Sequence, residues 1–119
     1  LKIRKELWAY SPDENLTIEE LFNEKYVGKR PAIGYPACPD HSEKKRIFEL
    51  LDVERSINIE LTDSYAMYPT ASVCGLFFSH PEAKYLLVGK ISDEQLNDYA
   101  KRKNEKPEIV GKFIKGMLD

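Results

Sequence analysis

The order of hydrophobic and polar positions divides the chain into short segments of different kinds. Over residues 1–10, leucine and tryptophan stand among charged residues, which predicts a short helical segment that ends before a loop at 11–15. Thr17 and Glu20 have the spacing of a capping box, in which each side chain accepts a hydrogen bond from the backbone amide of the other residue. A second helix is therefore predicted to begin here and to end near Tyr26.

The segment 28–40, GKRPAIGYPACPD, contains three prolines and two glycines in thirteen residues. Proline interrupts both helices and central strands, so this segment is predicted to be a fixed, extended loop. Asp40 is predicted to cap a helix over 41–52, with Glu43 three residues further on. Apolar residues recur at helical spacing within that helix: Ile47, Phe48, Leu50 and Leu51.

Three segments have the composition of β-strands. Residues 57–61 alternate between apolar and polar with a period of two, which predicts a half-buried strand. Residues 72–78 and 84–91 are denser apolar runs, separated by the five residues 79–83. This spacing predicts an antiparallel hairpin.

Two helices are predicted at the C-terminal end of the chain. Ser92 and Gln95 form a second capping box, and the helix that it opens ends in a basic turn at 101–103, where cations suit the helix dipole. Pro107 is predicted at the first position of the last helix. The apolar face of that helix is formed by Ile109, Val110, Phe113, Ile114 and Met117.

These helices and strands do not alternate as β-α-β units, so the predicted fold class is α+β, a small antiparallel sheet with helices packed around it. The 119 residues are 42% hydrophobic and 32% charged, which predicts one core and a single domain over 1–119. Three strands leave sheet edges exposed, and Leu1 stands inside a helical pattern. We therefore expect the chain to be a portion of a longer protein.

Charge, apolar run length and cysteine content argue against nucleic-acid and membrane partners. Eighteen basic and twenty acidic residues are interspersed and give a net charge of −2, which does not predict nucleic-acid binding. No apolar run approaches the roughly 18 residues that a membrane span needs, and no signal-peptide pattern is seen before the first predicted helix. The two cysteines suit a reducing compartment. A cytoplasmic protein without a membrane partner is expected.

Two cysteines and two histidines, Cys38, His41, Cys74 and His80, formally match a zinc-binding set. Their spacing argues against a metal site, because they fall in a proline-rich turn, at a helix start and in or near predicted strands. We expect structural roles for Cys38 and His41, since a role that depends on the tautomer of His41 needs a partner that the sequence does not identify. No serine, histidine and aspartate stand in the context of a hydrolase.

The loop segment RPAIGYP has the features of a binding loop. Arg30 offers a planar fork of donors that matches a carboxylate or phosphate, and Pro31 and Pro36 lower the entropy of the segment. Gly34 permits a close approach and Tyr35 adds a flat amphipathic surface. The pattern predicts a rigid loop that binds a small anionic or zwitterionic ligand. The alternative is a non-catalytic small-ligand or protein-interaction module in which Arg30 is a structural ion pair.

Four motifs in this order, RPAIGYPACPDH, SEKKRIFELL, LTDSYAMYPTASVCGLFFSHPEAKYLLVGKI and DYAKRK, resemble the later part of the C-terminal activation domain of cobalamin-dependent methionine synthase. The resemblance covers essentially the whole chain. It implies S-adenosylmethionine binding and support of the reductive methylation (reactivation) of cob(II)alamin. The whole enzyme transfers a methyl group from methyltetrahydrofolate to homocysteine in methionine biosynthesis, and this portion alone is not expected to be catalytic. A self-sufficient methyltransferase is disfavoured, because no glycine-rich strand-loop-helix motif is present.

The resemblance also implies a set of site residues on the proline-rich loop and near residue 85. Arg30 matches the residue that holds the carboxylate of the ligand, and Tyr35 matches a tyrosine directed at the cobalamin. The implied S-adenosylmethionine contacts are Arg30, Ala32, Gly34, Tyr85 and Leu86. Cobalamin and zinc are implied only in other domains of the whole enzyme. The implied partners are the cobalamin-binding domain of the same enzyme and flavodoxin or another reductase.

Overall fold

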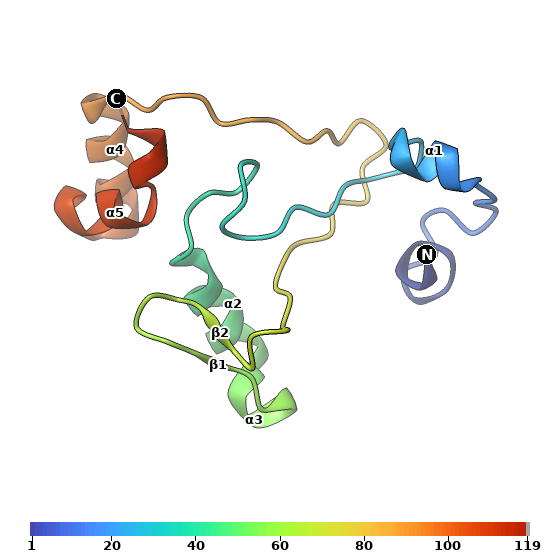
Figure 1. The fold of residues 1–119 in the computed structure, drawn as a ribbon, viewed down its shortest axis with the longest axis horizontal. Helices are drawn as coiled ribbons and strands as arrows, with labels where there is room; N and C mark the ends of the chain where they lie inside the picture. The colour runs from blue at the N-terminus through green and yellow to red at the C-terminus, as the bar shows by residue number, and fades with distance from the viewer. Residues whose placement is uncertain (119) are drawn as a thin grey trace. The chain divides into compact units, whose positions relative to one another are not determined.

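A computed structural model describes residues 1–118, which form two compact units (Figure 1). The first unit consists of Leu1–Arg30 and Leu76–Tyr85, and the second consists of Pro31–Gly75 and the chain from Leu86 onward. The structure contains helices and a small antiparallel sheet, so the predicted α+β class is confirmed. The single-domain organisation over 1–119 stays a prediction.

The helices of the first unit are η1 (Ile3–Leu7), a π-helical turn, and α1 (Ile18–Phe22). The capping box at Thr17 is confirmed: the amide of Glu20 donates to Thr17 Oγ1 at 3.2 Å, and the amide of Thr17 donates to Glu20 Oε2 at 2.8 Å. Helix α1 ends earlier than the predicted Tyr26, because Glu24 adopts a left-handed conformation with φ of 55°.

A buried ion pair fixes the N-terminal end of the first unit. Arg4 donates from Nε and Nη2 to the two carboxylate oxygens of Glu14, at 2.7 and 2.6 Å. The hydrogen bond from Arg4 lowers the pKa of Glu14 despite burial of its side chain. Lys5 Nζ donates to the backbone carbonyl of Glu14 at 2.8 Å. These contacts attach η1 to the predicted loop at 11–15.

The first two helices of the second unit are α2 (Glu43–Leu51) and α3 (Val53–Ile57). The predicted helix over 41–52 is largely present, but the prediction of Asp40 as its N-cap is wrong. Ser42 is the N-cap residue, and Asp40 instead accepts hydrogen bonds from the Ser42 amide at 2.8 Å and hydroxyl at 2.6 Å. Asp52, with φ of 48°, separates α2 from α3.

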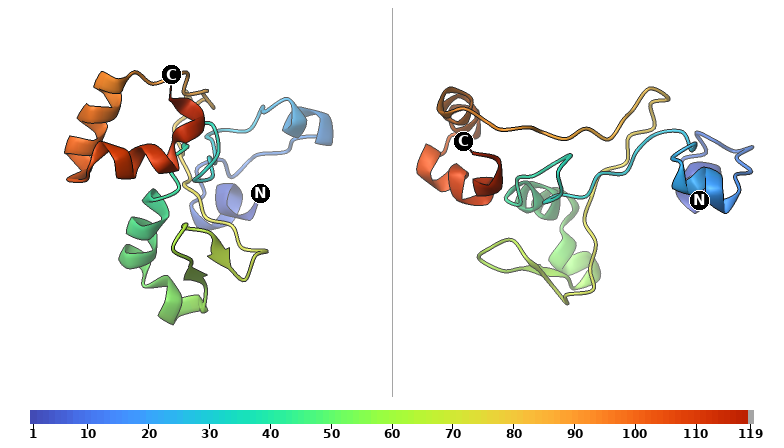
Figure 2. Two further views of the ribbon diagram at one scale, coloured as in Figure 1. Left: turned by 60° about the vertical axis from the view of Figure 1, so that its left-hand side comes forward. Right: turned by 45° about the horizontal axis from the view of Figure 1, so that its top comes forward.

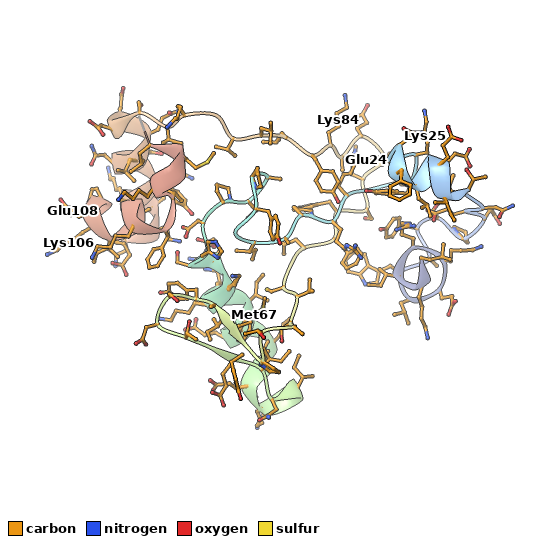
Figure 3. All side chains as sticks on the ribbon, viewed as in Figure 1. Glu24, Lys25, Met67, Lys84, Lys106 and Glu108 are labelled. Carbon is orange, nitrogen blue, oxygen red and sulfur yellow. The ribbon has the colours of Figure 1, made fainter. Side chains whose placement is uncertain are left out.

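The sheet of the second unit is a short hairpin. Strand β1 (Glu60–Leu61) pairs antiparallel with β2 (Met67–Tyr68), in the register Glu60 with Tyr68 and Leu61 with Met67. The predicted strand over 57–61 is therefore shortened at its start, because Ile57 completes α3. The sequence did not predict β2, whose residue Met67 is labelled in Figure 3.

The predicted hairpin of 72–78 with 84–91 is wrong, since neither segment forms a strand within residues 1–118. The backbone of 72–78 pairs instead with the proline-rich loop, through isolated antiparallel bridges of Lys29 with Phe78 in the first unit and of Ala32 with Gly75 in the second. A Cβ atom at Gly75 would lie 2.7 Å from the carbonyl oxygen of Pro31, so glycine permits this approach.

The C-terminal helices α4 (Asp93–Lys103) and α5 (Pro107–Phe113) confirm the last two predicted helices, and η2 (Lys115–Met117) follows them. Helices α4 and α5 lie side by side in both views of Figure 2 and in Figure 1. Their contact buries Ala100, Val110 and Ile114, with Leu96 and Tyr99 packed around them. Lys106 and Glu108, on either side of Pro107, keep exposed side chains (Figure 3). Over residues 1–118, no helix is long and apolar enough to span a membrane.

Candidate functional site

The proline-rich loop of the second unit is folded into two consecutive tight turns. The amide of Tyr35 donates to the carbonyl of Ala32 at 3.4 Å, and the amide of Cys38 donates to the carbonyl of Tyr35 at 2.8 Å. The amide of Gly34 donates to the carbonyl of Cys38 at 2.8 Å. Ile33 is buried and its amide donates to the carbonyl of Cys74. The loop is therefore fixed by its own backbone, and it is more strongly turned than the extended loop that was predicted.

Gly34 is the residue that these turns require to be glycine. Its φ of 96° lies in the left-handed region, which side chains disfavour. A Cβ atom at this position would also lie 2.2 Å from Cε1 of His41, whose ring packs directly against the turn. Glycine at this position therefore allows the His41 ring to pack against the backbone of the turn.

In the first unit, the structure brings Arg30 and Tyr85 together although 55 positions separate them. The backbone amide of Arg30 donates to the Tyr85 hydroxyl at 3.0 Å. Burial and a hydrogen bond with Tyr85 raise the pKa of Tyr26 to about 12. Lys29 Nζ lies 4.5 Å from the ring centroid of Tyr26 and pairs with Glu24 at 3.5 Å. These contacts fix the backbone at Arg30 rather than its side chain.

The guanidinium of Arg30 remains available to a ligand. The residue is exposed, and its Cζ atom lies 5.8 Å from the ring centroid of Phe77. Among residues 1–118, no carboxylate lies within 4.0 Å of the Arg30 side chain. This geometry favours a ligand-binding arginine over the alternative of a structural ion pair.

The remaining predicted site residues lie in the second unit. Tyr35 is 67% exposed and Leu86 is 61% exposed. Ala32, Gly34 and Tyr35 share one turn, and the segment that begins at Leu86 reaches it where the Val88 amide donates to the carbonyl of Pro36 at 3.4 Å. The turn and this segment together present exposed apolar and aromatic surface.

The two cysteines and the two histidines do not form a metal site in the described part of the chain. No group of three or more histidine, cysteine, aspartate or glutamate residues within 1–118 has the geometry to hold a metal ion. His80 Nδ1 accepts a hydrogen bond from the amide of Glu82, while His41 contacts Gly34 and Lys44. Burial raises the pKa of the Cys38 and Cys74 thiols, as for structural cysteines.

Sequence reasoning missed two groups that support the loop. Asp40, at its end, accepts hydrogen bonds from Tyr99 at 2.7 Å and Lys103 at 2.8 Å, so the loop is attached to α4. Lys44 is only 4% exposed. A signal for its burial existed, because Lys44 stands three and four positions before Ile47 and Phe48 and so lies on the apolar face of α2.

Comparison with known proteins decides the family. The sequence profile described as "Vitamin B12 dependent methionine synthase, activation domain" matches residues 1–104. The chain belongs to this activation-domain family. A crystal structure of the MetH reactivation domain bound to AdoHcy superposes with a TM-score of 0.90 at 50% identity, and the match covers 98% of this chain. The chain spans 36% of the length of that protein, and the likeness confirms both the fold class and the family predicted from the motifs.

Proposed function

We propose that this activation-domain chain binds S-adenosylmethionine and supports the reactivation of cobalamin in a methionine synthase. The observation that carries the proposal is the exposed guanidinium of Arg30 on a backbone fixed by Tyr85 in the first unit. In the sequence, Arg30 is followed by the segment that folds into the rigid glycine-containing turn of the second unit. The MetH reactivation domain, 50% identical to this chain, binds AdoHcy, the demethylated form of S-adenosylmethionine. The ligand class follows from both observations.

The chemistry of the ligand matches the residues proposed to hold it. S-adenosylmethionine has a carboxylate, an ammonium and a sulfonium, and a carboxylate is the partner that the planar donor fork of arginine fits best. We assign Arg30 to the carboxylate. Ala32 and Gly34 are proposed to offer backbone along the ligand, and Tyr85 and Leu86 to flank it.

Tyr35 is proposed to face the cobalamin rather than to hold the ligand. Its side chain is 67% exposed, so a large part of the ring is free to meet a partner domain. Cobalamin and zinc are assigned to other domains of the whole enzyme. The cobalamin-binding domain is then the first partner of this chain.

Cobalamin, held by another domain, would supply the nucleophile for this reaction once flavodoxin or another reductase has given it an electron. The bond from the sulfonium sulfur to the methyl carbon would break with its electron pair staying on sulfur, and the reduced cobalamin would accept the methyl group and supply the electron pair of the new bond to carbon. S-adenosylhomocysteine would be the by-product. The reactivated enzyme resumes methyl transfer from methyltetrahydrofolate to homocysteine, a reaction expected in the cytoplasm.

The test is ligand-dependent thermal unfolding of the protein with S-adenosylmethionine, S-adenosylhomocysteine and adenosine. A ligand that binds only the folded state raises the free energy of unfolding by about 2.7 kcal/mol at 100 times its dissociation constant. We expect S-adenosylmethionine and S-adenosylhomocysteine to stabilise the folded protein. Adenosine, which lacks the carboxylate, should not stabilise it. If adenosine stabilised the protein as much as the other two ligands, or if none of the three stabilised it, the proposed function would be wrong. The alternative, an interaction module in which Arg30 is a structural ion pair, would then be favoured.

A further inference from the structure

The second unit buries a charged side chain that the proposed ligand contacts do not use. Lys44, in the first turn of α2, is 4% exposed. Its Nζ atom donates to the backbone carbonyl of Tyr65 at 3.0 Å and lies 2.9 Å from Nδ1 of His41. Removing a lysine ammonium from water is unfavourable unless its donors are paired, so these two contacts hold Lys44 in place.

The contact between Lys44 and His41 determines where the imidazole proton lies. An ammonium group has donors and no acceptor, so Nδ1 of His41 accepts the hydrogen bond and has no proton. The neutral ring then has its proton on Nε2. Burial and the charge of Lys44 lower the pKa of His41, although Asp40 opposes them, so the neutral form is favoured.

The neutral ring lies against the turn that contains the predicted ligand contacts. A Cβ atom at Gly34 would fall 2.2 Å from Cε1 of His41 and 2.6 Å from each ring nitrogen, so the ring covers the Cα of Gly34. The amide of Gly34 is itself bonded to Cys38. A change in the orientation of the ring therefore removes the surface on which Gly34 rests.

We propose that Lys44 and His41 are positioning residues for the ligand-binding turn: Lys44 fixes the His41 ring as the Nε2-protonated form, and the ring holds Gly34 and its neighbours in the binding conformation. The inference rests on the proposed function, because the turn over Ala32–Tyr35 is the proposed ligand contact. It also supplies the partner for His41 that the sequence could not identify.

The alternative protonation states are disfavoured by the groups that face the pair. A proton on Nδ1 would point at the Lys44 ammonium and place two donors against each other. Around the pair, the charge of Asp40 favours the charged form of the ring. Burial lowers the pKa of Lys44, and the interaction with Cys74 opposes this shift. Burial and the nearby Cys38 raise the pKa of Cys74, while Lys44 opposes them. Of these groups, Lys44 is the one in hydrogen-bond contact with the ring.

The first measurement is the ring tautomer of His41 in the ligand-free protein, by long-range ¹H–¹⁵N correlation NMR at pH 7.5. The inference predicts an unprotonated Nδ1 and a protonated Nε2 in the unmodified protein, and loss of this preference in Lys44→Met. A protonated Nδ1 in the unmodified protein would overturn the inference. The tautomer of the unmodified protein is read without any ligand, and that result does not depend on whether Lys44→Met folds.

The second measurement is S-adenosylmethionine affinity by titration calorimetry. Lys44→Met keeps the aliphatic stem but removes the ammonium, and Lys45→Met is the matched control because Lys45 is exposed on the same helix. If loss of the ammonium lowers the fraction of molecules with a binding-competent turn to about one tenth, the apparent affinity falls about tenfold. Lys45→Met is expected to bind like the unmodified protein.

The outcomes separate the two proposals. Equal affinities of Lys44→Met and the unmodified protein would overturn the positioning role while the proposed function stands. No binding by the unmodified protein would overturn the proposed function, and the tautomer reading would still decide the arrangement of His41. A tenfold loss confined to Lys44→Met, together with the predicted tautomer, supports both.

Discussion

Replacement of Asp40 by asparagine is expected to destabilise the second unit strongly. Asp40 is 4% exposed, and its carboxylate accepts four hydrogen bonds: from the amide and hydroxyl of Ser42, from the Tyr99 hydroxyl and from Lys103 Nζ. Asparagine keeps the size of the side chain but replaces one acceptor oxygen by a donor group. In either orientation of the amide, that donor meets donors of Ser42 or of Tyr99 and Lys103.

The size of the destabilisation depends on whether Lys103 keeps an acidic partner in Asp40→Asn. Removing one member of a buried ion pair lowers the free energy of unfolding by about 3–5 kcal/mol. Lys103 also donates to Glu43 and keeps this partner in Asp40→Asn. We therefore expect the lower end of that range, about 3 kcal/mol, or a melting temperature lower by roughly 12 °C for a chain of this length.

The effect has a defined pH dependence. Burial alone would raise the pKa of Asp40, but the hydrogen bonds from Lys103, Ser42 and Tyr99 outweigh burial and the pKa is lowered. A carboxyl group with a lowered pKa in the folded state adds stability above its unfolded pKa of about 3.9 and loses it as the pH falls through the folded value. The difference between Asp40→Asn and the unmodified protein should be complete at pH 7 and shrink below about pH 4.

Urea unfolding at pH 7 and in acid is the assay, with Asp98→Asn as the control. Asp98 pairs with Arg102 at 2.9 Å, but both side chains are about two-thirds exposed, so its replacement should change stability by less than about 1 kcal/mol. Equal unfolding free energies of Asp40→Asn and Asp98→Asn at pH 7 would refute the reasoning.

Two further predictions concern local structure and the cobalamin encounter. Ser92→Ala removes the side chain that accepts from the Gln95 amide at 3.3 Å, so it should lower the free energy of unfolding by about 1 kcal/mol in a urea titration, and an unchanged midpoint would contradict this. Tyr35→Phe should keep S-adenosylmethionine affinity within about twofold, because an exposed hydroxyl contributes little, yet slow reactivation of the whole enzyme. Equal reactivation rates would count against the assignment of Tyr35.

Local interactions made several elements predictable from the sequence. The capping boxes at Thr17 and Ser92 join residues three positions apart, and both form as predicted. Pro107 opens α5 because its ring suits the first helical position. In each case the deciding interaction lies within one helical turn of the chain.

Pairing between distant segments was not predictable in the same way. The apolar run at 72–78 can pair with any extended neighbour. In the structure its backbone pairs with the proline-rich loop and not with residues 84–91. The left-handed conformation of Asp52 ends α2, and residues 53–57 then form a separate helix. The alternating pattern of 57–61 does not reveal that Ile57 belongs to this helix.

In the candidate site, too, local features were predictable from the sequence and contacts between distant residues were not. Loop composition identified the rigid segment that contains Arg30, because proline and glycine act locally. The contact of the Arg30 amide with Tyr85 joins residues 55 positions apart, and the burial of Lys44 depends on the carbonyl of Tyr65, 21 positions away. Motif resemblance supplied the ligand and the whole-enzyme context, which residue chemistry alone leaves open.

The central claim is that Arg30 holds the carboxylate of S-adenosylmethionine, and titration calorimetry of Arg30→Ala tests it most directly. Loss of a charge-assisted pair should weaken binding by about 2–4 kcal/mol, while the melting temperature without ligand stays nearly unchanged because the side chain is exposed. Arg55→Ala, which removes an arginine side chain that is 86% exposed, should bind like the unmodified protein. An Arg30→Ala protein that binds S-adenosylmethionine as tightly as the unmodified protein would contradict the account.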